Sequence, residues 1–224
     1  MFNYKDIRAF LGTLRKAGIP RKDFYYWRDA APKNLAALED HLGNPEDPER
    51  KLIRRILSDK KSTTLLDAGC GSATELRGYR INGLAIEYTG LDRQSAMFDF
   101  ARKNFSTDQQ AHFVEGDINN LPFKDGSFDT VLLKHVLEHQ QFYEGAVEEA
   151  IRVAKKTVVI NLYQRLLPTP FDIPLWNRNG FWNNWYSRSK FESYLVSLDA
   201  GHFEQTFVSG ISGQTAEIYV IDKC

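Results

Sequence analysis

The sequence contains few cysteines and no long apolar run. Only Cys70 and Cys224 are present among 224 residues, and two distant cysteines do not make the disulfide framework of a small secreted protein. No apolar run approaches the roughly 20 residues that a transmembrane helix needs. Residues 1–8 carry charges with no apolar segment behind them, unlike a signal peptide. We therefore expect a cytoplasmic protein without a membrane span.

The chain also lacks an excess of charge of either sign. It has 29 basic residues (Lys and Arg) and 29 acidic residues, so its formal net charge is zero. Proteins that bind nucleic acids through phosphate contacts usually have a basic excess or a basic stripe. We therefore do not expect a nucleic-acid partner. The composition does not indicate an oligomeric state.

Helical patterns occupy the first part of the chain. Apolar residues recur at helical spacing in residues 4–17, in residues 32–42 and from about Pro48 onwards, with Gly- and Pro-containing segments between them. No strand pattern precedes the end of the third stretch. We predict a helical N-terminal cap over residues 1–61 and an α/β domain over residues 62–224.

From residue 63 onwards, strand patterns alternate with helical ones. The strand-like runs cover residues 64–68, 88–91, 111–115, 128–134 and 157–162, with helical patterns at 95–104, 141–154 and 187–198. Alternating strands and helices are typical of a parallel sheet with right-handed crossovers. Two final runs flank Gly210 and Gly213, which predicts a hairpin over residues 202–221. The fold class is therefore α/β: a Rossmann-like seven-stranded, mostly parallel sheet with an antiparallel last strand and helices on both faces.

The segment from Leu65 to Ala73 reads as a buried strand, a tight glycine turn and the start of a helix. Gly69 and Gly71 allow the backbone to approach a ligand closely. The free N–H groups of the following helix would face that ligand. Two glycines also occur in purely structural turns, so the loop alone leaves both interpretations open.

Two carboxylates at strand ends favour the ligand-binding interpretation. Asp92 ends the second strand about 20 residues after Gly71, where a carboxylate can accept hydrogen bonds from both ribose hydroxyls. Asp117 follows the third strand and can accept a hydrogen bond from an exocyclic amino group of a base. A single aspartate at a strand end is often only a cap. Two of them in register with the glycine loop indicate a nucleoside-binding site.

These motifs resemble those of class I S-adenosylmethionine-dependent methyltransferases, and most of all the type 11 small-molecule branch. The segments that carry the resemblance are Asp67-Ala68-Gly69-Cys70-Gly71-Ser72-Ala73, Gly90-Leu91-Asp92, Gly116-Asp117-Ile118, Leu121-Pro122-Phe123, Ser127-Phe128-Asp129-Thr130-Val131, His135-Val136-Leu137-Glu138-His139 and Ala150-Ile151-Arg152-Val153. The resemblance covers about residues 63–162.

The sequence departs from the family pattern at two places. Ala73 stands where the loop usually has its third glycine, and a small side chain suffices there for helix packing. Ala154-Lys155-Lys156 replaces the usual Gly-Gly turn before the fifth strand, which changes a surface turn and not the cofactor site.

The resemblance implies that the cofactor is S-adenosylmethionine. Gly69 and Gly71 would hold its methionine part. Asp92 would hold the ribose, Asp117 the adenine amino group, and the backbone of Ile118 the adenine ring. The cofactor-binding residues that we expect are Asp67, Gly69, Cys70, Gly71, Asp92, Arg93, Asp117, Ile118, Lys134 and His135.

His135 is the candidate catalytic base. It follows the fourth strand, at the sheet edge that opens towards the methyl group. A histidine there can also pack against the methionine tail or cap a turn, and this alternative stays open. The spacing to His139 would suit a metal, but no third ligand is in register, so no metal site is predicted.

Aromatic residues are concentrated after the fifth strand, in residues 163–186. Their spacing follows neither a helix nor a strand, and an irregular segment of this length is often a functional lid. We predict that this lid contributes acceptor-binding residues, namely Trp176, Trp182, Trp185 and Tyr186. The alternative is that these rings pack against the aromatic residues 24–27 as a second core.

We predict methyl transfer to a small-molecule, lipid or sugar acceptor. An NAD-dependent dehydrogenase is a weaker alternative. Its Gly-x-Gly-x-x-Gly/Ala loop needs a small residue where this chain has Thr74. Asp67 would repel a pyrophosphate, but its charge suits a sulfonium and an ammonium group. A non-catalytic protein that binds the nucleoside is a further alternative. Motifs of base-modifying methyltransferases, such as Asn-Pro-Pro-Tyr or a Pro-Cys nucleophile, do not occur.

Overall fold

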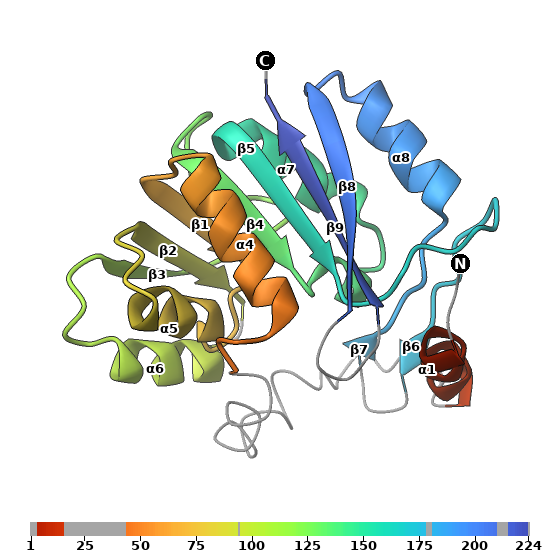
Figure 1. Cartoon of the computed structure of the whole chain (residues 1–224), viewed down its shortest axis with the longest axis horizontal. Coiled ribbons are helices and arrows are strands. Elements are labelled where there is room, and N and C mark those ends of the chain that lie inside the picture. Colours follow the sequence, from red (N-terminus) through yellow and green to blue (C-terminus); the bar gives the residue numbers. More distant parts are fainter. Residues whose placement is uncertain (1–3, 16–43, 94, 178–180, 210–214, 224) are drawn as a thin grey trace.

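The framework of the protein is a seven-stranded sheet with the order β3-β2-β1-β4-β5-β9-β8 (Figure 1). The structure is a computed structural model that describes residues 4–15, 44–93, 95–177, 181–209 and 215–223. The strands are β1 (Thr64–Ala68), β2 (Glu87–Asp92), β3 (Ala111–Glu115), β4 (Phe128–Lys134), β5 (Ala154–Leu162), β8 (His202–Ser209) and β9 (Thr215–Asp222). The strand pairs β3–β2, β2–β1, β1–β4 and β4–β5 are parallel, whereas β9 is antiparallel to both of its neighbours, β5 and β8. The predicted Rossmann-like sheet with an antiparallel last strand is therefore confirmed.

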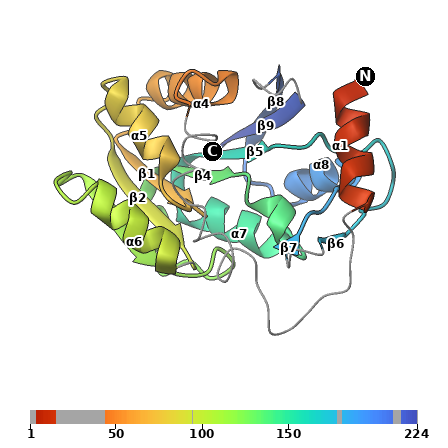
Figure 2. The ribbon, with the colours of Figure 1, turned by 90° about the horizontal axis from the view of Figure 1, so that it is seen from below.

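Helices cover both faces of this sheet. They are α4 (Pro48–Asp59), α5 (Thr74–Ile81), α6 (Ser95–Asn104), α7 (Glu144–Val153) and α8 (Arg188–Ser197). A further helix, α1 (Tyr4–Arg15), lies to the side of the sheet (Figure 1). The apolar residues of α4, α5 and α6 share one core, and those of α7 and α8 share the other, so the two groups lie on opposite sides of the sheet (Figure 2). In the described part of the chain, no helix combines the length and apolar character needed to cross a bilayer.

The central strands are buried on both faces. Side chains of successive strand residues point to opposite faces, and Leu132 of β4 lies in the core under α4 to α6. Its neighbours Val131 and Leu133 lie in the core under α7 and α8. Continuous apolar strands of this kind are typical of parallel sheets covered by helices.

Helix α4 fixes one end of the N-terminal segment on the sheet. The carboxylate of Asp47 caps it by accepting a hydrogen bond from the N–H of Glu49 at 2.9 Å. Ile53 and Leu57 are buried in the same core as β1. Within the predicted cap of residues 1–61, this helix is therefore an integral layer of the α/β unit.

The junction between α7 and β5 differs from the prediction. The sequence predicts a helix to Ala154 and a strand from Thr157, but the strand begins at Ala154, directly after the helix. Ala154 has an extended backbone with φ −73° and ψ 138°. The chain therefore passes from helix to strand without a turn, which accounts for the missing Gly-Gly pair.

The aromatic segment of residues 163–186 contains regular structure that the sequence does not predict. β6 (Trp176–Asn177) pairs antiparallel with β7 (Phe181–Trp182). Helix α1 lies beside this hairpin (Figure 1), and the amide of Asn183 donates a hydrogen bond to the hydroxyl of Thr13 at 3.4 Å. The predicted helix at 32–42, the aromatic residues 24–27 and the turn with Gly210 and Gly213 lie outside the described residues.

Candidate functional site

The predicted cofactor residues gather at the carboxyl ends of β1, β2 and β4. Asp67 is paired in register with Gly90 of β2 and Leu132 of β4, and Asp92 and Lys134 are the last residues of those two strands. The strand order reverses between β1 and β4. In open α/β sheets, ligands bind outside the carboxyl ends of the strands at such a switch point.

The turn after β1 requires glycine for two separate reasons. Gly69 and Gly71 have φ values of +87° and +56°, in the left-handed region that side chains disfavour. A Cβ on Gly69 would lie 2.5 Å from Cγ2 of Val136, the neighbour of His135. The glycine turn and the segment after β4 are therefore in direct contact.

Ala73, in place of the third glycine, also has a left-handed backbone, with φ +59°. It precedes the first residue of α5 and is fully buried. A left-handed alanine costs roughly 1–2 kcal/mol. A small side chain is therefore not the only requirement at this position, because the residue must also adopt a left-handed backbone.

Asp92 connects the end of β2 to the glycine turn. Its Oδ2 accepts a hydrogen bond from the N–H of Gly71 at 2.9 Å. The N–H groups of Gly69 and Cys70 donate to the carbonyl oxygen of Leu91 at 2.7 and 3.0 Å. The turn is thus held against the strand end by three backbone N–H groups.

Asp117 and Arg93 form the outer rim of this group. Oδ2 of Asp117 lies 3.6 Å from the Arg93 guanidinium, and both side chains are nearly half exposed. Oδ1 of Asp117 accepts a hydrogen bond from the N–H of Asn119 at 2.9 Å. Ile118 is buried in the core below them. The carboxylate of Asp117 thus lies at the exposed edge of this group, next to a buried apolar residue.

Asp67 is a buried carboxylate at the centre of the site. It is 2% exposed and accepts a hydrogen bond from the hydroxyl of Tyr88 at 2.8 Å. Burial, with a further contribution from the charge of Glu75, raises the pKa of Asp67 to about 7. A cationic ligand beside Asp67 would stabilise its ionised form.

Lys134 belongs to a buried cluster of charges. Its Nζ lies 3.6 Å from Oε1 of Glu75, and a guanidinium nitrogen of Arg50 lies 2.7 Å from the same oxygen. All three side chains are almost fully buried. Arg50 and Glu75 come from α4 and α5, so this cluster joins both helices to the end of β4.

His135 stands at the point where β4 meets α4. Its backbone is left-handed, with φ +53°, and Nε2 lies 2.8 Å from Oε2 of Glu49. Burial lowers the pKa of His135 and the charge of Lys134 lowers it further, while Glu49 acts in the opposite direction. Sequence reasoning missed Glu49, because an acidic residue in the first turn of a helix is ordinary and carries no signal of its own.

A second buried acid, Glu138, follows His135 by three residues, and sequence reasoning missed it as well. Its Oε1 accepts a hydrogen bond from the N–H of Tyr163 at 2.7 Å. Burial raises the pKa of Glu138 to about 8. His139 donates through Nδ1 to the carbonyl oxygen of Trp182 at 2.7 Å, and burial lowers the pKa of His139 to about 4. His139 is therefore a neutral anchor for β7.

The four predicted acceptor residues occupy different environments. Trp185 is 1% exposed and its ring packs edge-on against Phe10 of α1 at 5.0 Å, so it packs on an N-terminal helix. Tyr186 is also buried, and its hydroxyl donates to the carbonyl oxygen of Leu137 at 2.7 Å.

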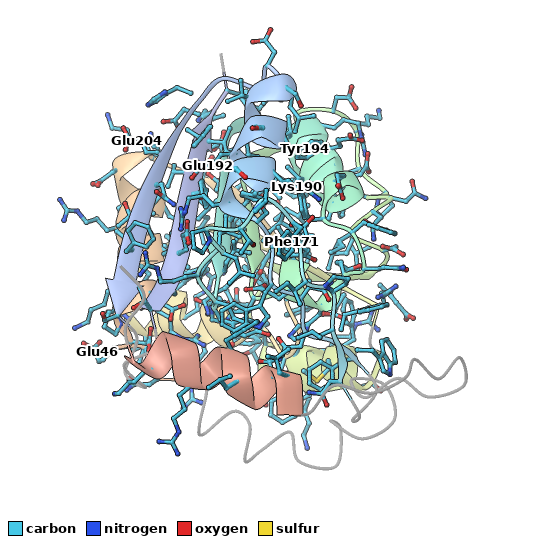
Figure 3. All side chains as sticks on the ribbon, turned by 90° about the vertical axis from the view of Figure 1, so that its right-hand side faces the viewer. Glu46, Phe171, Lys190, Glu192, Tyr194 and Glu204 are labelled. Carbon is cyan, nitrogen blue, oxygen red and sulfur yellow. The ribbon has the colours of Figure 1, made fainter. Side chains whose placement is uncertain are left out.

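Trp176 and Trp182 pair edge-to-face at 5.2 Å across the β6–β7 hairpin. Trp182 is half-buried, whereas Phe171, labelled in Figure 3, is 55% exposed on the outside of the segment. Of the four predicted residues, Trp182 is thus the one that is not buried, and its backbone carbonyl contacts His139.

Comparisons with known proteins agree with this geometry. A family model described as a methyltransferase domain matches residues 66–160. A demethylmenaquinone methyltransferase from Staphylococcus haemolyticus (strain JCSC1435) is 30% identical over 143 residues, which are 61% of this chain and 60% of that protein. The chain thus spans less than two thirds of the length of this relative.

Two solved structures share the fold. A putative O-methyltransferase from Nostoc punctiforme PCC 73102 has a TM-score of 0.65 at 14% identity, covering 98% of this chain and 68% of that one. The [4+2]-cyclase SpnF has a TM-score of 0.65 at 16% identity, covering 92% of this chain and 99% of that one. At these identities the likeness shows the fold alone. Residues 66–160 thus match the model of a methyltransferase domain, and they lie within a sheet whose fold is shared with these solved structures.

Proposed function

We propose that the protein binds S-adenosylmethionine at the carboxyl ends of β1, β2 and β4 and transfers its methyl group to a small-molecule, lipid or sugar acceptor. One observation carries the proposal. The glycine turn after β1 is tied to Asp92 at the end of β2 by the Gly71 hydrogen bond, beside the switch point of the sheet.

The residues present suit this cofactor. Asp67 is a buried acid with a raised pKa, and the ammonium and sulfonium groups of S-adenosylmethionine are cations that would stabilise its ionised form. A dinucleotide would instead bring its pyrophosphate near Asp67 and Asp92. Charge therefore favours the methyltransferase over an NAD-dependent dehydrogenase.

Bound S-adenosylmethionine supplies an electrophilic methyl group on sulfur. The protein positions the two reactants and excludes water from them. We propose that Gly69 and Gly71 hold the methionine part and that Asp92 holds the ribose. The adenine would lie at Asp117 and the Ile118 backbone. The residues Asp67, Cys70, Arg93, Lys134 and His135 complete the cofactor site, with His135 placed as the base.

The acceptor side of the site is proposed to include Trp182, because this residue is only half-buried and its carbonyl oxygen contacts His139. The relative from Staphylococcus haemolyticus is named for a demethylated quinone. We therefore propose that the first acceptors to test are ring-bearing small molecules and lipids of this kind, followed by sugars.

The direct test is transfer of an isotopically labelled methyl group from S-adenosylmethionine to a panel of demethylated quinones, phenols and sugars, read by mass spectrometry. Labelled product, together with its loss in Asp92→Ala, is expected. The fold is shared with a cyclase, so a protein that binds the nucleoside without transferring its methyl group is the second candidate. Tight binding without labelled product across the whole panel would favour that candidate.

A further inference from the structure

Glu49 and His135 are far apart in the sequence and in contact in the structure. Glu49 lies in the first turn of α4, and its Oε2 is 2.8 Å from Nε2 of His135. The Glu49 side chain is 11% exposed and that of His135 is 32% exposed. The carboxylate is therefore largely shielded from water, while part of the imidazole ring is open.

This contact defines which nitrogen of the ring carries the proton. Burial raises the pKa of Glu49, while the hydrogen bond with His135 and the positive charge of Lys134 are among the contributions that lower it. On balance the pKa of Glu49 is lowered, so the carboxylate is ionised. An ionised carboxylate only accepts hydrogen bonds. Nε2 of His135 must therefore donate its hydrogen to Glu49, which leaves the lone pair of the neutral ring on Nδ1.

Lys134 acts on the ring through its charge. Its Nζ lies 3.2 Å from Nδ1 and 3.4 Å from Nε2 of His135. The in-plane lone-pair directions of the two nitrogens diverge, so an atom nearly equidistant from both lies over the ring and not along the Nδ1 lone pair. The ammonium thus favours the neutral imidazole without occupying the position where a proton would be accepted.

The other ionisable groups near the ring complete its environment. Glu75 of α5 adds a negative charge from the far side of Lys134. The ring of Tyr163 meets that of His135 edge-on at 5.5 Å, and buried His139 lies beyond Tyr163. The chain therefore surrounds one accessible imidazole with an orienting carboxylate and a cation that keeps it unprotonated.

We propose that Glu49 is a positioning residue that holds His135 as the base for an acidic acceptor hydroxyl, of the phenol or enol type. This inference rests on the methyl-transfer function proposed above and names its acceptor class. In the step, the acceptor O–H bond breaks and its proton passes to Nδ1 of His135. The acceptor oxygen forms a bond to the methyl carbon, and the carbon–sulfur bond breaks with its electron pair left on sulfur, which yields S-adenosylhomocysteine.

The choice of an acidic hydroxyl follows from the properties of the base. Burial and Lys134 lower the pKa of His135, so the ring is unprotonated at neutral pH but binds a proton weakly. Proton transfer is most effective when the pKa of the base is close to the pKa of the hydroxyl group that loses its proton. Phenols and enols come closer to this condition than the hydroxyls of sugars, which are less acidic.

The first test requires no acceptor. Nuclear magnetic resonance of the full chain with ¹⁵N-labelled histidine reports which ring nitrogen of His135 carries hydrogen. We expect hydrogen on Nε2 in the wild type and a further decrease of the His135 pKa in Glu49→Gln, because the carboxylate charge is lost. The matched control is Glu46→Gln, an exposed glutamate just before α4 (labelled in Figure 3), which should leave the His135 pKa unchanged.

The second test separates this inference from the proposed function. With a phenolic acceptor, Glu49→Gln should lower kcat by about tenfold or more and move the acid limb of the kcat–pH profile to lower pH, while affinity for S-adenosylhomocysteine stays within about twofold. Thermal unfolding shows whether the variant is folded. Hydrogen on Nδ1 in the wild type, or an unchanged His135 pKa in folded Glu49→Gln, would overturn the inference even if the protein proves to be a methyltransferase. Absence of nucleoside binding would instead contradict the proposed function.

Discussion

The carboxylate of Asp92 and the backbone N–H of Gly71 are joined by a 2.9 Å hydrogen bond. This bond connects the end of one strand to the turn that follows its neighbour. It fixes the orientation of the glycine turn, which we propose holds the methionine part of S-adenosylmethionine. The fold thus places the N–H groups of the glycine turn and the carboxylate of Asp92 side by side.

Gly69 should be intolerant of even one added carbon. Gly69→Ala places a methyl group 2.5 Å from Cγ2 of Val136 at a left-handed backbone position. The left-handed alanine costs roughly 1–2 kcal/mol and the overpacking about 1–3 kcal/mol. We expect a loss of about 2–5 kcal/mol in the free energy of unfolding, the sum of these two costs, measured by urea denaturation.

The double variant Gly69→Ala/Val136→Ala isolates the steric part of that loss. Removing the Val136 methyl groups should relieve the clash, so the double variant should lose less than the sum of the two single variants. Strictly additive losses would show that Val136 does not limit the space beside the turn.

Glu138 should make stability depend on pH in a defined direction. Its pKa is raised to about 8 in the folded protein, above the ordinary value near 4.3 in an unfolded chain. Between these values the folded state binds a proton that the unfolded state has lost, so stability falls as the pH rises, by about 1.4 kcal/mol per pH unit.

Glu138→Gln removes this titration and keeps an acceptor oxygen for the N–H of Tyr163. Urea denaturation from pH 5 to pH 8 should show the variant gaining stability relative to the wild type as the pH rises. Glu204→Gln, at an exposed position labelled in Figure 3, serves as the control and should follow the wild-type curve. Parallel curves for wild type and Glu138→Gln would mean that Glu138 ionises normally.

The tryptophans of the aromatic segment should respond differently to truncation. Trp185 is buried against Phe10, so Trp185→Ala should cost about 3–5 kcal/mol of stability. Trp182→Ala should cost clearly less, because the ring is half-buried and the backbone carbonyl that binds His139 remains. It should instead raise the KM for the acceptor while leaving nucleoside affinity unchanged. Unfolding of both variants would assign the whole segment to the scaffold.

The sheet and the glycine turn were predictable because their signals are local. The apolar run before Asp67 and the two glycines after it specify a buried strand and a tight turn without any knowledge of distant residues. The Glu49–His135 contact was not predictable, since it depends on how α4 packs across the sheet. Nor was the contact of Trp185 with α1, because an irregular aromatic segment does not reveal which surface its rings will meet. The left-handed backbone of Ala73 was not predictable either, because an alanine in the sequence does not indicate that conformation.

Calorimetric titration with S-adenosylmethionine and S-adenosylhomocysteine tests the central claim most directly, in the wild type, Asp92→Asn and the surface control Asp99→Asn. Hydrogen bonds to a charged group contribute about 1.5–3 kcal/mol each. We therefore predict saturable binding by the wild type, equal binding by Asp99→Asn, a loss of at least about tenfold in Asp92→Asn, and no binding of NAD. Binding of NAD without binding of either nucleoside, or an unchanged affinity in folded Asp92→Asn, would contradict the account.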